Sequence, residues 1–215
     1  MYTVYVVEDD DIFRAWLVAI LSTGPGLTVK EFESGEAFLE GMSDLAPGAV
    51  LMDLRMPGLS GIETFERYRA RRADFPTVVV SGDGDIHTAV QAMRTGAVNF
   101  LVKPFSQVDL FAAINECFER LVAQMRDSDA RSMHAARLEK LSQREGEVLR
   151  LMVQGYANRH IADSLEVSVR TVETFRAKLM AKLNVSNLPE AISLACDAGF
   201  VDLADVGTAF RRKSG

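Results

Sequence analysis

The chain lacks the features that would place it in a membrane or outside the cell. None of its apolar runs approaches the roughly eighteen residues that a membrane-spanning helix needs. Its N-terminus has neither a basic start nor a small-residue cleavage site, so it does not resemble a signal peptide. The two cysteines, Cys117 and Cys196, lack metal-ligand spacing, and we expect both to be buried thiols in a reducing compartment. These absences predict a cytoplasmic protein with no membrane partner.

Charge is unevenly distributed along the chain. Residues 1–120 contain 18 acidic and 10 basic side chains, which gives a net charge of −8. Residues 139–215 contain 10 acidic and 11 basic side chains, a net charge of +1, and the stretch from Arg159 to Lys182 is clearly basic. An acidic first part and a locally basic second part predict two domains with different tasks.

The first 120 residues alternate between short apolar runs and helical patterns. The alternation predicts an α/β doubly wound five-stranded parallel sheet, with helices on both faces. The expected strands are residues 2–7, 28–32, 49–53, 77–81 and 98–102. The expected helices are residues 11–22, 35–44, 61–72, 85–95 and a helix that begins near residue 106.

Polar side chains stand where four of these strands end. They are Glu8 and Asp9, Asp53, Ser81, and Lys103 followed by Pro104. Because the carboxyl ends of parallel strands meet at one edge of an open sheet, we expect these side chains to share one pocket. Carboxylates at close range favour a divalent cation such as Mg²⁺, and an ammonium and a hydroxyl can bind phosphate oxygens. The set therefore predicts phosphoryl transfer to Asp53; the alternative, a solvated acidic turn, suits Asp10 and Asp11 at the start of the next helix.

The helix that begins near residue 106 has an apolar stripe that continues past the expected end of the domain. The stripe has the 3, 4, 3, 4 spacing of a coiled coil and consists of Phe111, Ile114, Phe118, Leu121 and Met125. The same stripe would also suit packing on the sheet. Residues 126–137 contain no proline or glycine. We therefore favour a linker over residues 121–140 that continues this helix, against a helix that ends near Met125 and a flexible polar linker.

After Leu141 the whole pattern is helical. The expected helices are residues 142–153, 158–165, 169–184 and 188–198, with Ser168 as an N-cap and with Gly155 and Gly199 at C-terminal ends. Four short helices, the third of them basic, predict a small all-α helix-turn-helix domain over residues 141–200. Residues 201–215 are expected to be a frayed tail.

The third of these helices has an apolar face and a polar face. Val172, Leu179 and Leu183 form the apolar stripe. The polar face is typical of a helix that enters the major groove of double-stranded DNA, where central residues contact bases and flanking cations contact phosphates. We expect Phe175 to pack inward. The candidate base contacts are Glu173 and Thr174, Arg170 lies on the same face, and the candidate phosphate contacts are Arg159, Thr171, Arg176, Lys178 and Lys182. For any single lysine here, a solvated position is the alternative.

Four motifs of the first domain stand in a recognisable order and spacing: VVED at 6–9, MDLRMPGLSG at 52–61, SG at 81–82 and LVKPF at 101–105. On these motifs residues 1–120 resemble the receiver domain of bacterial two-component response regulators. The resemblance implies that a sensor histidine kinase phosphorylates Asp53, with Lys103 and Ser81 assisting. It further implies that Asp9, Asp53 and the backbone carbonyl of Arg55 bind Mg²⁺, with Glu8 near it through water. Phe100 would couple phosphorylation to the face formed by the fourth helix and the fifth strand, with plain core packing as the alternative.

A second pattern extends over residues 141–187 and consists of Leu141, Arg144, Glu145, Val148, Leu149, Gly155, Asn158, Ile161, Ala162, Leu165, Val167, Ser168, Thr171, Val172, Lys182, Leu183 and Val185. On these residues the second domain resembles the LuxR/GerE-type helix-turn-helix of the NarL/FixJ regulators. The two resemblances together imply a DNA-binding regulator that forms a homodimer when phosphorylated, through the face of the fourth helix and the fifth strand. His87, Val90 and Arg94 are the candidate dimer contacts, and RNA polymerase is a further candidate partner. The protein would be no enzyme beyond assisting its own phosphorylation and dephosphorylation.

Two functions from other classes compete with this interpretation. One is a magnesium-dependent phosphotransferase, which would need a pocket for a small substrate over Asp53. The other is an interaction module that works without phosphorylation, with a DNA-binding domain that serves only as a tether. DNA binding that ignores phosphorylation would favour the second, and turnover of a phosphoester would favour the first.

Overall fold

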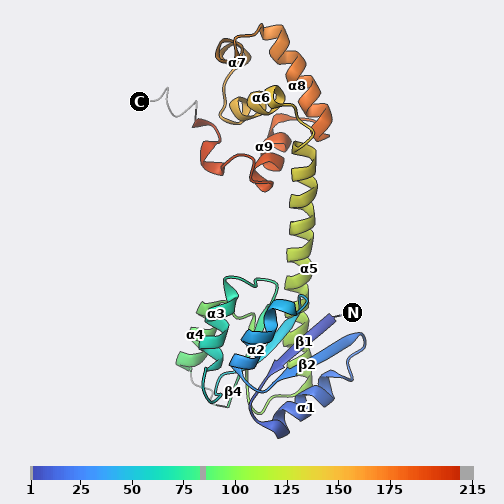
Figure 1. Cartoon of the computed structure of the whole chain (residues 1–215), viewed down its shortest axis with the longest axis vertical. Coiled ribbons are helices and arrows are strands. Elements are labelled where there is room, and N and C mark those ends of the chain that lie inside the picture. The colour runs from blue at the N-terminus through green and yellow to red at the C-terminus, as the bar shows by residue number, and fades with distance from the viewer. Residues whose placement is uncertain (1, 83–85, 209–215) are drawn as a thin grey trace. The chain divides into compact units, whose positions relative to one another are not determined.

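The computed structural model describes residues 2–82 and 86–208. The chain divides into two compact units, Met1–Met125 and Arg126–Gly215, each of which is described by itself below (Figure 1).

The first unit is built on a five-stranded parallel sheet. Its strands are β1 (Tyr2–Val7), β2 (Leu27–Phe32), β3 (Ala49–Asp53), β4 (Thr77–Ser81) and β5 (Asn99–Val102). They lie in the order β2-β1-β3-β4-β5, as the doubly wound prediction requires. The order reverses between β1 and β3, which are neighbours, so the carboxyl ends of these two strands flank the point where open α/β sheets bind ligands. The predicted fold class is confirmed.

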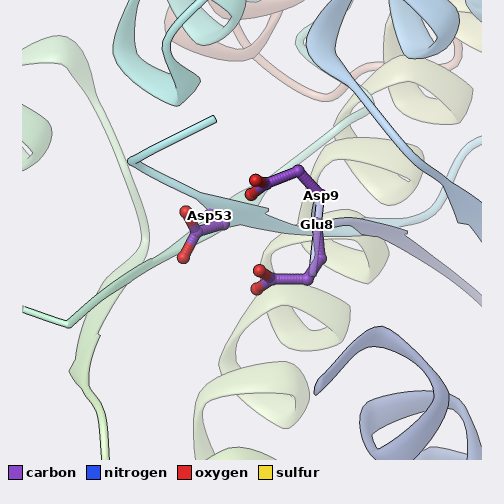
Figure 2. A group of neighbouring side chains, drawn as sticks. All are labelled: Glu8, Asp9 and Asp53. Carbon is purple, nitrogen blue, oxygen red and sulfur yellow. The ribbon is translucent and has the colours of Figure 1, made fainter. Parts of the chain in front are cut away.

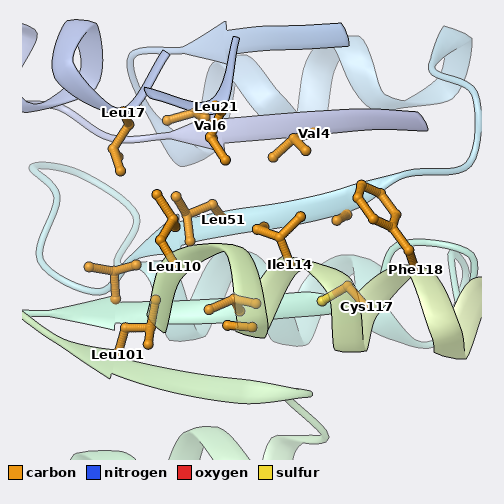
Figure 3. Close-up of a cluster of buried hydrophobic side chains, with 14 of the residues drawn as sticks. Val4, Val6, Leu17, Leu21, Leu51, Leu101, Leu110, Ile114, Cys117 and Phe118 are labelled. Atoms are coloured by element: carbon orange, nitrogen blue, oxygen red, sulfur yellow. The ribbon is translucent and has the colours of Figure 1, made fainter. Parts of the chain in front are cut away.

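Helices cover both faces of this sheet. They are α1 (Asp11–Leu21), α2 (Gly35–Gly41) followed by the short 3₁₀ helix η1 (Met42–Asp44), α3 (Gly61–Arg69), α4 (Ile86–Thr95) and α5 (Gln107–Leu138). Side chains of β1 alternate between two cores. Val4 and Val6 pack with α1 and α5, whereas Tyr5 and Val7 pack on the opposite face. Figure 3 shows the first of these cores between the sheet and α5.

Helix α5 answers the two questions that its sequence left open. Within the first unit, Ile114, Phe118 and Leu121 are buried in the core beneath the sheet, so these residues pack on the sheet and are not free for a coiled-coil partner. Met125, the last residue of the stripe, has 58% of its surface exposed. The helix also continues past Met125, as a single helix from Gln107 to Leu138.

The second unit contains the predicted helices. They are α6 (Gln143–Val153), α7 (Asn158–Leu165), α8 (Val169–Leu183) and α9 (Leu188–Asp197). Ser168 caps α8 by accepting a hydrogen bond from the backbone N–H of Thr171. Gly155 and Gly199 follow α6 and α9 with φ of 90° and 68°, a backbone conformation that favours glycine. The core of this unit joins all four helices to Leu138, at the end of α5.

Two sequence-based expectations need correction. Cys117 is buried, but Cys196 is only partly buried, because the buried side of α9 is formed by its neighbours Leu194 and Ala195. Residues 200–208 contain a 3₁₀ helix, η2 (Leu203–Asp205), and the Gly207 N–H donates a hydrogen bond to the Val153 carbonyl at 3.0 Å. Apolar side chains of this segment pack on the core of the second unit and hold it there. The rest of the predicted tail, residues 209–215, lies outside the described residues.

Among the helices described, none is both long and apolar enough to cross a membrane.

Candidate functional site

Three carboxylates meet at the carboxyl edge of the sheet in the first unit. Glu8 and Asp9 directly follow β1, and Asp53 is the last residue of β3. Since β1 and β3 are hydrogen-bonded neighbours, one oxygen from each carboxylate lies within 4.8 Å of the other two (Figure 2). Glu8 and Asp53 are buried, with 2% and 4% of their surface exposed, whereas Asp9 is partly exposed. The cluster therefore offers several hard oxygen ligands, the set that Mg²⁺ prefers.

Lys103 links the two buried carboxylates. Its Nζ lies 2.8 Å from Glu8 Oε2 and 2.7 Å from Asp53 Oδ1. Burial raises the pKa of Glu8, against the lowering effect of the Lys103 hydrogen bond. For Lys103, burial acts to lower the pKa, but the hydrogen bonds to Asp53 and Glu8 outweigh it and the pKa is raised. The ammonium therefore stays charged. One positive charge then faces three carboxylates, and a divalent cation would balance the excess of negative charge.

The loop after β3 fixes the other side of Asp53. The backbone N–H of Arg55 donates to Asp53 Oδ2 at 2.7 Å. Farther along, the backbone N–H of Leu59 donates to the Glu36 carboxylate of α2 at 2.8 Å. Both oxygens of Asp53 thus have a donor, one cationic and one from the backbone, and the loop carrying the Arg55 backbone is anchored to α2.

Gly61 is required by the close approach of α3 to this loop. A Cβ at Gly61 would lie 2.0 Å from the backbone carbonyl oxygen of Asp53, and the Gly61 N–H donates to the Leu54 carbonyl at 3.1 Å. We expect Gly61→Ala to destabilise the first unit by about 2 kcal/mol, because backbone atoms must move to admit the methyl group. Gly82→Ala is the matched control, since a Cβ there meets nothing within 4 Å. Urea unfolding followed by the fluorescence of Trp16 measures both variants, and equal stability would contradict the prediction.

The structure adds a residue that the sequence pattern did not single out. The guanidinium of Arg14 donates to the backbone carbonyl of Glu8 at 2.7 Å and to that of Asp9 at 3.4 Å, and it pairs with the carboxylates of Asp11 and Glu31. Arg14 therefore holds the backbone that carries the acidic pair. Backbone acceptors leave no trace in a sequence, so no motif could have identified this contact.

Ser81 and Phe100 lie where the strand pattern predicted. Ser81 ends β4 and is buried, and it lines a cavity of about 270 Å³ together with Leu54 and Arg55, which follow Asp53. Phe100 is half-buried on β5 and packs against the core on the α3 and α4 face of the sheet. The three candidate dimer contacts on α4, His87, Val90 and Arg94, are exposed.

In the second unit, α8 presents the predicted polar face. Val172, Leu179 and Leu183 are fully buried. Phe175 is half-buried against the same core, so it does pack inward. The exposed candidate DNA contacts are Arg159 on α7 and Arg170, Glu173, Thr174, Lys178 and Lys182 on α8, and the half-exposed ones are Thr171 and Arg176.

Some of these candidates have partners within the second unit. Arg176 donates to the side-chain oxygen of Asn158 at 2.8 Å, which fixes the guanidinium between α7 and α8. The Thr171 hydroxyl lies 2.8 Å from that of Ser168, in the cap of α8. Contacts of this kind orient a side chain and leave donors available to a ligand.

Lys182 differs from the other candidates. Its Nζ lies 2.6 Å from Oε2 of Glu145, a carboxylate with only 3% of the residue surface exposed. Glu145 also accepts from the Ser142 N–H at 2.7 Å in the capping box that begins α6. Burial acts to raise the pKa of Glu145, but the hydrogen bonds from Lys182 and Ser142 outweigh it and the pKa is lowered. The ammonium of Lys182 is therefore engaged in neutralising a buried charge.

Comparisons with known proteins agree with both units. Residues 4–115 match the response regulator receiver domain, and residues 139–195 match the bacterial regulatory proteins of the luxR family. The chain is 41% identical to the transcriptional regulatory protein FixJ of Azorhizobium caulinodans over 202 residues, which cover 94% of this chain and 95% of that protein. It is also 41% identical to FixJ of Rhizobium meliloti over 199 residues, 93% of this chain and 97% of that protein.

Two solved structures are similar over nearly the whole chain. The response regulator StyR has a TM-score of 0.71 and 34% identity, and the match covers 90% of this chain and 97% of that one. Full-length FixJ from B. japonicum has a TM-score of 0.57 and 36% identity, with 94% and 98% covered. The chain belongs to the two-component response regulators that join a receiver domain to a luxR-type DNA-binding domain, and it is a DNA-binding regulator of transcription.

Proposed function

We propose that Asp53 is the residue that a partner sensor histidine kinase phosphorylates. One observation carries the proposal: the buried Asp53 carboxylate has one oxygen on the Lys103 ammonium and the other on the Arg55 N–H. Such fixed donors stabilise charge that develops on an accepted phosphoryl group. In the reaction a carboxylate oxygen of Asp53 bonds to phosphorus while the phosphorus–nitrogen bond of the donor phosphohistidine breaks, which leaves an acyl phosphate.

The acidic cluster fits Mg²⁺ as the cofactor. Asp9, Asp53 and the backbone carbonyl of Arg55 are the ligands we propose, with Glu8 near the ion through water. Mg²⁺ would supply the positive charge that draws phosphoryl oxygens toward Asp53. The Lys103 ammonium would exchange a hydrogen bond to a carboxylate for one to a phosphoryl oxygen. The buried Ser81 hydroxyl would donate a hydrogen bond to another phosphoryl oxygen. The catalytic work of the receiver is limited to its own phosphorylation and dephosphorylation.

Phosphorylation would act on DNA binding through a homodimer. We place the dimer contact on the face of α4 and β5, where His87 and Arg94 are exposed, and where Val90 and Val102 have 44% and 42% of their surface exposed. Phe100, on β5, is the residue we propose to couple the pocket to this face. Two DNA-binding domains in a dimer match two half-sites, so dimerisation raises affinity for a paired operator.

The exposed face of α8 is the part we propose to enter the major groove. Glu173 and Thr174 would contact bases, with Arg170 beside them on the same face. Arg159, Thr171, Arg176 and Lys178 would contact phosphates. We omit Lys182 from the phosphate contacts because its ammonium pairs with Glu145.

We propose RNA polymerase as a further partner at the promoter. We also propose that the protein acts in the cytoplasm, where bacterial DNA lies.

Mapping of the phosphoryl group tests the proposal. Incubation with acetyl phosphate and Mg²⁺ should add one phosphoryl group to the chain, and borohydride reduction of the acyl phosphate should mark the peptide that contains Asp53. The same treatment should increase the affinity for a paired operator. A phosphoryl group on any other residue, or steady release of product from a small phosphoester, would overturn the assignment.

A further inference from the structure

We propose that Phe13 is a positioning residue that holds the Lys103 ammonium at Asp53 through the face of its aromatic ring. The inference rests on the proposed phosphorylation of Asp53. The Nζ of Lys103 lies 4.1 Å from the centre of the Phe13 ring, in addition to its contacts with Glu8 and Asp53. An ammonium at this distance is attracted by the negative face of the ring.

The local structure fixes the position of the Phe13 ring. Asp10 caps α1 by accepting from the N–H groups of Ile12 and Phe13, both at 2.9 Å, which sets the first turn of the helix. Trp16, one turn later, stacks on the ring with centroids 5.3 Å apart and planes 20° apart. Phe105, two residues after Lys103, meets the ring edge-on at 6.0 Å. Lys103 and Phe105, one of the residues that support the Phe13 ring, therefore come from the same loop.

A ring suits this position because it attracts a cation without accepting its strong hydrogen bonds. A carboxylate at the same place would compete with Asp53 for the ammonium. The two carboxylates that hold Lys103 also carry the oxygens that a phosphoryl group and a metal ion would engage. When these oxygens are engaged, the Phe13 ring still attracts the ammonium. The effect of Phe13 should therefore be greatest during phosphorylation.

The alternative is that Phe13 only fills space, since it also packs against the core between the sheet and α5. Fluorination separates the two roles, because each added fluorine weakens the ring's attraction for a cation and changes its volume little. We expect the rate of phosphorylation by acetyl phosphate to fall stepwise when Phe13 is replaced by mono-, di- and trifluorophenylalanine, by about tenfold in all. Phe13→Tyr should keep the rate within about twofold, because it keeps the ring. The same series at Phe118, buried at the far end of this core, is the control and should be flat.

A second measurement needs neither metal nor phosphate. Phe13→Leu, Lys103→Met and the double variant form a cycle on the urea unfolding of the full chain, reported by Trp16, the one tryptophan of the chain. We expect the unfolding equilibrium constant of the double variant to differ by about threefold or more from the value that two independent substitutions would give. A flat fluorine series at Phe13, or a cycle without coupling, would overturn the inference. A wild-type chain that takes no phosphoryl group at Asp53 would instead overturn the proposed function, while the unfolding cycle would still decide the role of Phe13.

Discussion

Asp53→Asn should not dimerise with beryllofluoride, whereas we expect the wild-type chain to do so. The substitution keeps the size of the side chain and removes its charge, so the Lys103 ammonium loses one of its two carboxylate partners. It also replaces the carboxylate with an amide, whose oxygen is a poor nucleophile, so acetyl phosphate should add no phosphoryl group. Size-exclusion chromatography with light scattering, at one protein concentration with and without beryllofluoride, measures the effect, and we expect the wild type alone to change from monomer to dimer.

The control for this experiment is Asp44→Asn, a change of the same chemistry on an exposed residue of η1. It should dimerise like the wild type. DNA binding by unphosphorylated Asp53→Asn should equal that of the unphosphorylated wild type, because the second unit is unchanged. A variant at position 53 that still dimerises normally with beryllofluoride would show that the response does not depend on this carboxylate.

The sequence predicted the sheet and the acidic pocket because both follow from local patterns. The four-residue apolar runs before Asp53 and Ser81 identify buried strands, and the polar residue that ends each run identifies the edge at which they meet. Strand ends were within one residue of their predicted positions, since the apolar run and the ladder of the sheet end together. Helix ends were less accurate. The predicted helix over residues 61–72 ends at Arg69, and Arg72 instead turns its guanidinium to the carbonyls of Met42 and Leu45.

What the sequence could not supply were contacts between segments far apart in the chain. In the sequence Phe13 is only an apolar residue of a predicted helix. The fold shows that Lys103, ninety positions later, lies over its ring. Lys182 resembles a DNA contact because it is a cation on a helix with a polar face. Its partner Glu145 lies 37 residues earlier, and the same glutamate reads as part of a helix cap. A charge whose partner is remote cannot be told from a free one by spacing alone.

Lys182→Met and Lys178→Met should therefore fail in different ways. Lys182→Met leaves the buried Glu145 carboxylate without its cation, so the second unit should lose about 2 kcal/mol of stability. Lys178 is exposed on α8, and Lys178→Met should leave stability unchanged. The loss of the Lys178 charge should weaken DNA binding at every sequence. It should also lower the slope of log affinity against log salt by about 0.9, the value for one phosphate contact. Hydrogen exchange in α6 and α8 measures the first effect, and salt titration of operator binding measures the second.

The pH dependence of the Lys182→Met defect tests its cause. The folded-state pKa of Glu145 is lowered, so this group stabilises the second unit above its unfolded-state pKa, and the stabilisation is lost as the pH falls through the folded-state pKa. A protonated Glu145 no longer needs the ammonium. The difference in stability between wild type and Lys182→Met should therefore be largest near neutral pH and should shrink on acidification, while Lys178→Met should follow the wild type throughout. A constant difference across this range would mean that Lys182 supports the fold by packing of its alkyl chain and not by its charge.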